Sequence, residues 1–188
     1  MSDSGHALWV ARHAPVLASG RCYGRAAVPV AVAHDEAARM LARTYQGALP
    51  ALVWSSPLVR CRAVAERLAT HWGVALSIDD ALYEIDFGAW EGREWDEIAA
   101  NDPAGVAAWS ADWLSVAPPG GECASDLETR VRAWWSRLPR SITHVLVAHG
   151  GVIRALRVIA RHEPWHDAMT REVVHLAWVQ HAFDAADH

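Results

Sequence analysis

The pair Arg12-His13 stands where an apolar run, residues 7–11, comes to an end. Pro15 follows and disfavours the continuation of a strand as an ordinary sheet ladder. A neutral imidazole is available as a nucleophile at pH 7, because the pKa of histidine is ordinarily about 6.5. A guanidinium offers a planar fork that matches two oxygens of a phosphate. We therefore predict that His13 is a nucleophile and that Arg12 helps to hold a phosphate group.

Two further apolar runs also lead to side chains suited to phosphate chemistry. Residues 51–54 precede Arg60, and residues 143–148 end in His149 and Gly150. Parallel strands carry their carboxyl ends at one edge of a sheet, where ligands of open α/β sheets bind. If all these runs are parallel strands, two arginines and two histidines meet in one pocket. Glycines after His149 would also let backbone N–H groups at a helix start approach an anion.

A phosphate ester leaves a poor alkoxide, which needs a proton from a carboxylic acid. Glu84, in the loop after the third predicted strand, is the candidate for this proton donor. The same carboxylate could then deprotonate the water that hydrolyses a phosphohistidine. Asp86, Glu91 and Glu94 lie nearby in the sequence and are its rivals.

The spacing of apolar residues predicts the elements that must position these side chains. Strand-like runs alternate with helical spacing, which predicts an α/β fold. We expect one domain over residues 1–188, built as a three-layer α/β/α sandwich with a mostly parallel central sheet and helices on both faces. The expected strands are 7–11, 51–54, 74–78, 143–148 and 173–183, and the expected helices are 31–46, 58–71, 93–100, 103–113, 124–138 and 151–162.

Five stretches carry these candidate residues in a recognisable arrangement. They are Arg12-His13; Ser55-Ser56-Pro57-Leu58 with Arg60; Glu84 with Phe87-Gly88 and Trp90-Glu91-Gly92; Pro119-Gly120-Gly121-Glu122; and Ala148-His149-Gly150-Gly151. Together they resemble the histidine phosphatase (phosphoglycerate-mutase-like) superfamily over nearly the whole chain. The resemblance implies a phosphohistidine at His13, a phosphate pocket of Arg12, Arg60 and His149, and Glu84 as the proton donor.

Within that superfamily, two stretches resemble the alpha-ribazole phosphatase branch. These are Arg21-Cys22-Tyr23-Gly24-Arg25, and Ala14-Pro15-Val16 in place of the common Gly-Glu-Thr. The resemblance implies removal of the 5′-phosphate of alpha-ribazole phosphate in the synthesis of the lower ligand of cobalamin.

Substrate contacts are expected from Ser19, Tyr23 and Gly24, besides Gly150 at the predicted helix start. The alternative for Tyr23 and Gly24 is an ordinary turn. Ser19 stands about where relatives have a phosphate-contacting Asn, and Ala14 replaces a glycine with a less flexible residue. Three tryptophans in the middle of the chain, Trp90, Trp109 and Trp113, are candidates for the wall of a pocket.

Composition argues against several other classes of function. The 188 residues are 52% hydrophobic and carry a formal net charge of −5, which does not favour a nucleic-acid partner. No apolar run approaches the ~20 residues of a membrane span, and residues 1–6 lack the features of a signal peptide. We expect a cytoplasmic enzyme that acts on a small anionic phosphate ester without metal or cofactor. A long apolar edge would allow a homodimer.

Other activities remain as alternatives. One is a phosphatase for another small ester, or a phosphotransferase of the phosphoglycerate mutase type. Another is a non-catalytic phosphate-binding module. A third is a zinc-dependent hydrolase, since His162-Glu163-Pro164-Trp165-His166 fits the H-E-x-x-H pattern. That pattern needs a continuous helix, and Pro164 predicts a helix end followed by a loop instead.

Overall fold

One five-stranded sheet lies at the centre of the computed structural model, which describes residues 6–183. The strand order is β3-β2-β4-β1-β5. β4 pairs in parallel with β1 and with β2, and β2 pairs in parallel with β3, whereas β5 is antiparallel to β1. The bounds are β1 Ala7–Arg12, β2 Leu52–Ser55, β3 Ala75–Ile78, β4 His144–Ala148 and β5 Trp178–Ala182.

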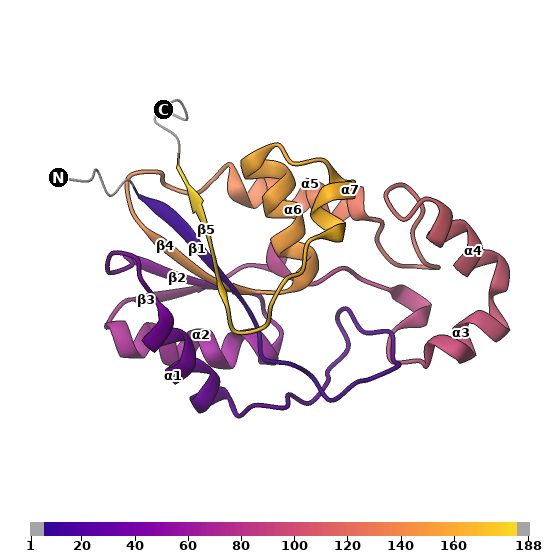
Figure 1. Cartoon of the computed structure of the whole chain (residues 1–188), viewed down its shortest axis with the longest axis horizontal. Helices are drawn as coiled ribbons and strands as arrows, with labels where there is room; N and C mark the ends of the chain where they lie inside the picture. The colour runs from indigo at the N-terminus through magenta and orange to yellow at the C-terminus, as the bar shows by residue number, and fades with distance from the viewer. Residues whose placement is uncertain (1–5, 184–188) are drawn as a thin grey trace.

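Helices cover both faces of this sheet, which confirms the three-layer α/β/α sandwich (Figure 1). One face is covered by α1 (His34–Thr44) and α2 (Val59–Trp72), and the other by α5 (Ala124–Trp135) and α6 (Gly150–Arg161). α7 (Trp165–Thr170) packs beside α6.

The central strand β4 shows why the sequence requires two helical layers. All five of its residues are buried. Leu146 and Ala148 belong to the core on the α5/α6 side, whereas Val145 and Val147 belong to the core on the α1/α2 side. Because successive side chains of a strand point to opposite faces, an apolar run of this kind is stable only between two covering layers.

A smaller unit stands beyond the carboxyl end of the sheet (Figure 1). It contains α3 (Trp95–Asn101) and α4 (Pro103–Ala111), the two short helices expected from the sequence. Asp102 separates them, and its side chain accepts the backbone N–H of Gly105 at 3.0 Å. Pro103 at the first helical position needs no N–H partner, so the pair starts α4 efficiently.

Most expected elements are present, with bounds that differ by up to three residues, but the C-terminal part differs more. No helix is expected after Pro164, yet α7 begins there. The last strand is expected over 173–183, but β5 is confined to Trp178–Ala182. The reason is that the preceding residues bind the end of β1: the N–H of Leu176 donates to the carbonyl of Arg12 at 3.0 Å.

The H-E-x-x-H segment is not a continuous helix. α6 ends at Arg161, and His162 adopts a left-handed conformation with a φ of 52°. His166 belongs to the next helix, α7. Among residues 6–183, no group of three or more His, Cys, Asp or Glu side chains is placed to hold a metal ion. In the same range, no helix combines the length and apolar character of a membrane span.

A buried histidine on the edge strand β5 predicts a loss of stability in acid. His181 is 2% exposed, and neither ring nitrogen has a hydrogen-bond partner among the described residues. Burial, together with the charges of Arg161 and Arg157, lowers its pKa to about 3. Between pH 6.5 and 3 the unfolded chain therefore binds a proton that the folded chain does not, so stability falls as the pH falls.

We expect His181→Phe to reduce this acid sensitivity. The loss in unfolding free energy between pH 7 and pH 5 should be smaller than in the wild type by roughly 2 kcal/mol, because one proton is no longer taken up on unfolding. Urea denaturation at the two pH values measures the difference. Equal losses in both proteins would show that His181 is protonated without unfolding.

Candidate active site

The parallel pairing of β1 with β4 brings two histidines together. Arg12 is opposite Ala148 in the register, and the N–H of His13 donates to the carbonyl of Ala148 at 3.0 Å. The rings of His13 and His149 follow directly, with centroids 5.2 Å apart in an edge-to-face arrangement. The two strand ends expected to converge from the sequence therefore lie side by side.

The surroundings of His13 leave one ring nitrogen free to react. Nδ1 lies 2.6 Å from the carbonyl oxygen of Ala14. Since a carbonyl only accepts, Nδ1 carries the proton, and Nε2 keeps its lone pair. Burial lowers the pKa of His13 to about 3, and the charges of Arg60 and Arg12 act in the same direction. His13 is therefore neutral near pH 7, which is the state that a nucleophile needs.

The alanine after His13 fits its position without backbone strain. Among the described residues other than glycine, only His162 and Leu176 have a positive φ. Ala14 therefore has an ordinary conformation, and the glycine common in relatives is not needed for backbone freedom here.

His149 is completely buried and is held by a hydroxyl. Its Nε2 lies 2.8 Å from Oγ of Ser56, and Sγ of Cys61 lies 3.4 Å from the same nitrogen. Burial lowers the pKa of His149 well below its usual value, and the neighbouring His13 and Arg60 lower it further. Both histidines are thus neutral in the free protein.

Arg12 and Arg60 are held by backbone carbonyls. Arg12 donates to the carbonyl of Val173 at 2.7 Å. Arg60 donates to the carbonyl of Ala26 at 3.0 Å and to that of Gly24. The Nε atoms of both arginines are buried and have no acceptor among the described residues. Each guanidinium therefore keeps its full charge and a free donor for an anion.

Glu84 reaches the start of α6. Its Oε2 accepts the N–H of Gly151 at 3.1 Å, and its Oε1 accepts the N–H of Ile85 at 3.0 Å. A Cβ on Gly151 would collide with the Glu84 carboxylate, so this contact requires a glycine. Gly151 is two residues after His149, which places the carboxylate beside the paired histidines.

The loop that carries Glu84 is fixed by Arg130 of α5. This arginine donates to the carbonyls of Ala81, Tyr83 and Glu84 at 2.8, 2.7 and 3.1 Å. It also pairs with Glu122 at 2.8 Å. Burial alone would raise the pKa of Glu122, but the hydrogen bonds and charge of Arg130 outweigh it and lower that pKa. A paired, ionised Glu122 thus orients Arg130, which in turn orients the Glu84 loop.

The three rival carboxylates have partners of their own. Asp86 pairs with Arg25 at 3.2 Å, and Glu94 pairs with Arg21 at 2.7 Å. Glu91 is enclosed by backbone N–H groups. Among these four candidates, Glu84 is the one bonded to the helix start that follows His149.

Glu91 connects two segments that are far apart in the sequence. Its carboxylate accepts N–H groups from Gly24, Arg25, Ala26 and Phe87 at 2.8–3.1 Å. Two of these residues, Gly24 and Ala26, are the ones whose carbonyls bind Arg60. The tripeptide 24–26 is therefore bound from both sides, and Glu91 positions Arg60 through it.

The three residues expected to contact the substrate, Tyr23, Gly24 and Ser19, differ in how they relate to the paired histidines. Tyr23 lines a cavity with Glu84, and its ring faces the guanidinium of Arg60 at 5.9 Å. Gly24 is buried against the carbonyl of Ile85, so it serves as backbone support for Arg60. Ser19 is exposed in a turn, and within residues 6–183 it has no hydrogen bond to a residue of the site.

The tryptophan prediction is right for two of three residues. Trp109 and Trp113 line the same cavity as Glu84, whereas Trp90 is 1% exposed and lies in a separate core with Cys22 and Ile98.

Several residues of the site were not identified from the sequence. His175 lies beside His13, with ring centroids 5.3 Å apart, and its Nδ1 lies 2.6 Å from the carbonyl oxygen of His13. Burial lowers its pKa. Arg130 and Arg154 are the other two. No local sequence pattern marks these residues. His175 and Arg130 contact residues more than 40 positions away, and Arg154 lines the cavity from α6.

We expect Glu91→Gln to weaken phosphate binding without abolishing the fold. The amide would direct its own donors at backbone N–H groups, and Arg60 would lose its fixed position. The inhibition constant of orthophosphate should rise about tenfold. Glu97→Gln, on the exposed side of α3, is the matched control and should leave that constant unchanged. A folded Glu91→Gln protein with unchanged phosphate inhibition would contradict the positioning role.

Comparisons with known proteins show what the chain as a whole is similar to. An adenosylcobalamin/alpha-ribazole phosphatase of Escherichia coli (strain K12) is 29% identical over 154 residues, which are 79% of this chain and 76% of that protein. A glucosyl-3-phosphoglycerate phosphatase of Mycobacterium tuberculosis is 35% identical over 118 residues, 57% of this chain and 52% of that protein. The crystal structure of the alpha-ribazole phosphatase from Shigella flexneri has a TM-score of 0.83 at 26% identity, covering 93% of this chain and 89% of that one.

Some relatives are much longer than this chain. A bifunctional protein of Mycobacterium tuberculosis is 39% identical over 127 residues, which are 66% of this chain but 34% of that protein. The chain thus spans between a third and about half of the length of the first curated relatives that it matches. The family match itself extends over residues 8–185, and by this match the chain belongs to the histidine phosphatase superfamily, branch 1.

Proposed function

We propose that the protein hydrolyses phosphate monoesters through a phosphohistidine at His13. The observation that carries the proposal is the state of this ring: Nδ1 is bound to the Ala14 carbonyl, Nε2 is free, and two arginines with unpartnered Nε donors lie beside it. A neutral imidazole enclosed by cations is suited to attack an anionic phosphorus centre.

In the first step, Nε2 of His13 attacks phosphorus in line with the ester oxygen. The N–P bond forms as the P–O ester bond breaks. Arg12, Arg60 and His149 bind the equatorial oxygens, where negative charge is spread in the transition state. Glu84, in its protonated form, gives its proton to the leaving alkoxide.

In the second step, water attacks the phosphohistidine from the side that the alcohol has left. The Glu84 carboxylate takes one proton of this water as the new O–P bond forms and the N–P bond breaks. Orthophosphate leaves, His13 is again neutral, and Glu84 is again protonated. The cycle balances without a metal ion or cofactor.

Two substrates are suggested by relatives, and we propose alpha-ribazole 5′-phosphate. The similarity to an alpha-ribazole phosphatase extends over 79% of the chain, against 57% for a glucosyl-3-phosphoglycerate phosphatase. The cavity beside Glu84 has five aromatic side chains in its wall, which favours an alcohol that carries a flat aromatic ring. The three cysteines are free and buried, which is consistent with a reducing compartment such as the cytoplasm.

Replacement of the nucleophile should abolish turnover. His13→Asn should lower kcat by about 10⁴-fold or more, and no phosphoenzyme should form. Rapid acid-free quenching with a ³²P-labelled ester, followed by treatment with acid, detects an acid-labile phosphohistidine in the wild type. His71→Asn, an exposed histidine on α2, is the control and should behave as the wild type. A labelled His13→Asn protein would place the nucleophile elsewhere.

Replacement of the proton donor should depend on the leaving group. Glu84→Gln keeps the hydrogen-bond acceptor for Gly151 but cannot transfer a proton, so kcat for an alkyl phosphate should fall by about 10²–10⁴-fold. For 4-nitrophenyl phosphate, whose leaving group needs no proton, kcat should fall much less. The comparison is made under steady-state conditions at one pH. Equal losses for both esters would remove Glu84 from the role of general acid.

The substrate itself is identified by phosphate release from a panel of esters. We expect alpha-ribazole 5′-phosphate to have the highest kcat/KM, above glucosyl-3-phosphoglycerate, 3-phosphoglycerate and nucleoside monophosphates. A chelator should not change the rates, because the proposed cycle uses no metal. A preference for glucosyl-3-phosphoglycerate would replace the proposed substrate but leave the chemistry in place.

A further inference from the structure

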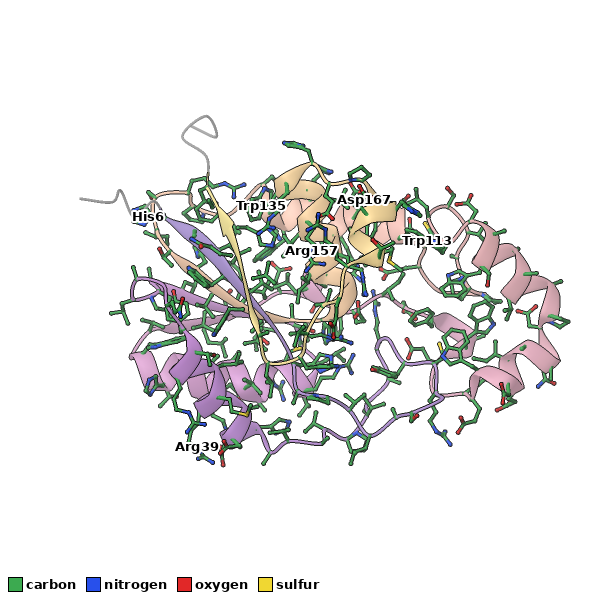
Figure 2. The ribbon with its side chains drawn as sticks, viewed as in Figure 1. His6, Arg39, Trp113, Trp135, Arg157 and Asp167 are labelled. Carbon is green, nitrogen blue, oxygen red and sulfur yellow. The ribbon has the colours of Figure 1, made fainter. Side chains whose placement is uncertain are left out.

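A cavity of about 240 Å³ lies beside Glu84, on the side away from the two helices α1 and α2. Its lining comes from the loop after β1, from the 84–113 region, and from α5, α6 and α7. Figure 2 shows Trp113 on the segment that follows α4, close to α7, and its ring meets that of Trp165 at 5.8 Å. The aromatic walls are Tyr23, Phe87, Trp109, Trp113 and Trp165.

One charged side chain of the lining has no partner. Arg154, on the first turns of α6, is partly buried, and among the described residues it forms no hydrogen bond or ion pair. Its Nε is fully enclosed without an acceptor. Burial lowers the pKa of Arg154, and the charge of Arg12 lowers it further. A buried Nε–H without an acceptor is costly for the fold, so its presence at the wall of a cavity points to a ligand.

The position of Arg154 relates the cavity to the phosphate site. A Cβ on Gly150 would lie 3.2 Å from Nη1 of Arg154 and 3.6 Å from Cζ of Arg12. The two guanidinium groups therefore meet over the start of α6. Glu84 occupies the other side of this start, at Gly151. Arg154 thus stands between Arg12 and the aromatic cavity, where the alcohol joined to a bound phosphate would begin.

Glu84 lines the same cavity but is not an ion-pair partner of Arg154. Both carboxylate oxygens of Glu84 accept backbone N–H groups, from Gly151 and Ile85, and neither forms an ion pair with Arg154. Glu84 acts to raise the pKa of Arg154, but burial and the charges of Arg12 and Arg157 outweigh it. A ligand in the cavity would supply the acceptor that Nε of Arg154 lacks among the described residues.

We propose that Arg154 is a specificity-determining residue that binds oxygen atoms of the leaving alcohol near its ester bond, while the aromatic walls bind a flat ring further along the same alcohol. The inference rests on the proposed function for the place of the phosphate. The substrate class is a phosphate ester whose alcohol combines hydroxyl or ring oxygens close to the ester with an aromatic group. A ribose ester of a flat base has this pattern, whereas a simple aryl phosphate has the ring without the oxygens.

Arg154→Met removes every donor and keeps a long side chain, which makes it the test variant. We expect kcat/KM for alpha-ribazole 5′-phosphate to fall at least about tenfold, mainly through KM. The corresponding value for phenyl phosphate and the inhibition constant of orthophosphate should change less than about threefold. Arg161→Met, at the exposed end of α6, is the matched control and should match the wild type in all three measurements.

Binding of free alpha-ribazole gives a measurement that does not need turnover. Three tryptophans line the cavity, so the ligand should quench tryptophan fluorescence, and Arg154→Met should raise its dissociation constant at least about tenfold. Thermal unfolding checks that the variant is folded. If Arg154→Met weakened all ligands equally, orthophosphate included, Arg154 would be assigned to the phosphate instead. Unchanged binding of alpha-ribazole by the variant would overturn the proposal. Absence of alpha-ribazole binding by the wild type would overturn it as well. Retained binding without phosphate release would instead reject the proposed function.

Discussion

The last hydrogen bonds of the β1–β4 ladder determine where His13, the proposed nucleophile, stands. The backbone N–H of His13 donates to Ala148, and its carbonyl is bound by His175 at 2.6 Å. Leu176 binds the carbonyl of the preceding residue, Arg12. The backbone of His13 is therefore fixed on both sides, by the central strand and by the segment before β5. A group held by a sheet is positioned more precisely than one on a loop, and the in-line attack needs that precision.

The electrostatics of the site follow from how its cations are held. Arg12 and Arg60 bind carbonyl oxygens, which orient a guanidinium without neutralising its charge. Two nearby carboxylates act elsewhere, since Glu91 accepts backbone N–H groups and Glu122 pairs with Arg130. Burial, together with this positive charge, keeps the histidines neutral, and the charge attracts an anion. Its cost to the fold is offset only when an anion is bound, which is typical of a preorganised site.

Sequence periodicity was sufficient for the sheet, the two helical layers and the convergence of His13 with His149, because each of these depends on local patterns. The contacts that support the site cannot be predicted from such local patterns. Glu91 binds residues 65–67 positions earlier, and His175 binds a residue 162 positions earlier. The apolar residues of the C-terminal segment predict a longer strand, because they do not reveal that residues 173–176 bind the end of β1. Such tertiary contacts override local propensity.

Most groups of the proposed phosphate site and most walls of the proposed alcohol site come from different parts of the fold. His13, His149 and Arg60 stand at the ends of β1 and β4 and at the start of α2, within the α/β layers. The cavity walls come mostly from the connecting segment around α3 and α4 and from α7, which lie outside the sheet. Changes at Trp109, Trp113 or Trp165 alter this cavity without touching the β1–β4 ladder that holds His13. An alpha-ribazole phosphatase and a glucosyl-3-phosphoglycerate phosphatase both share this fold, as expected if walls that the sheet does not constrain select the alcohol.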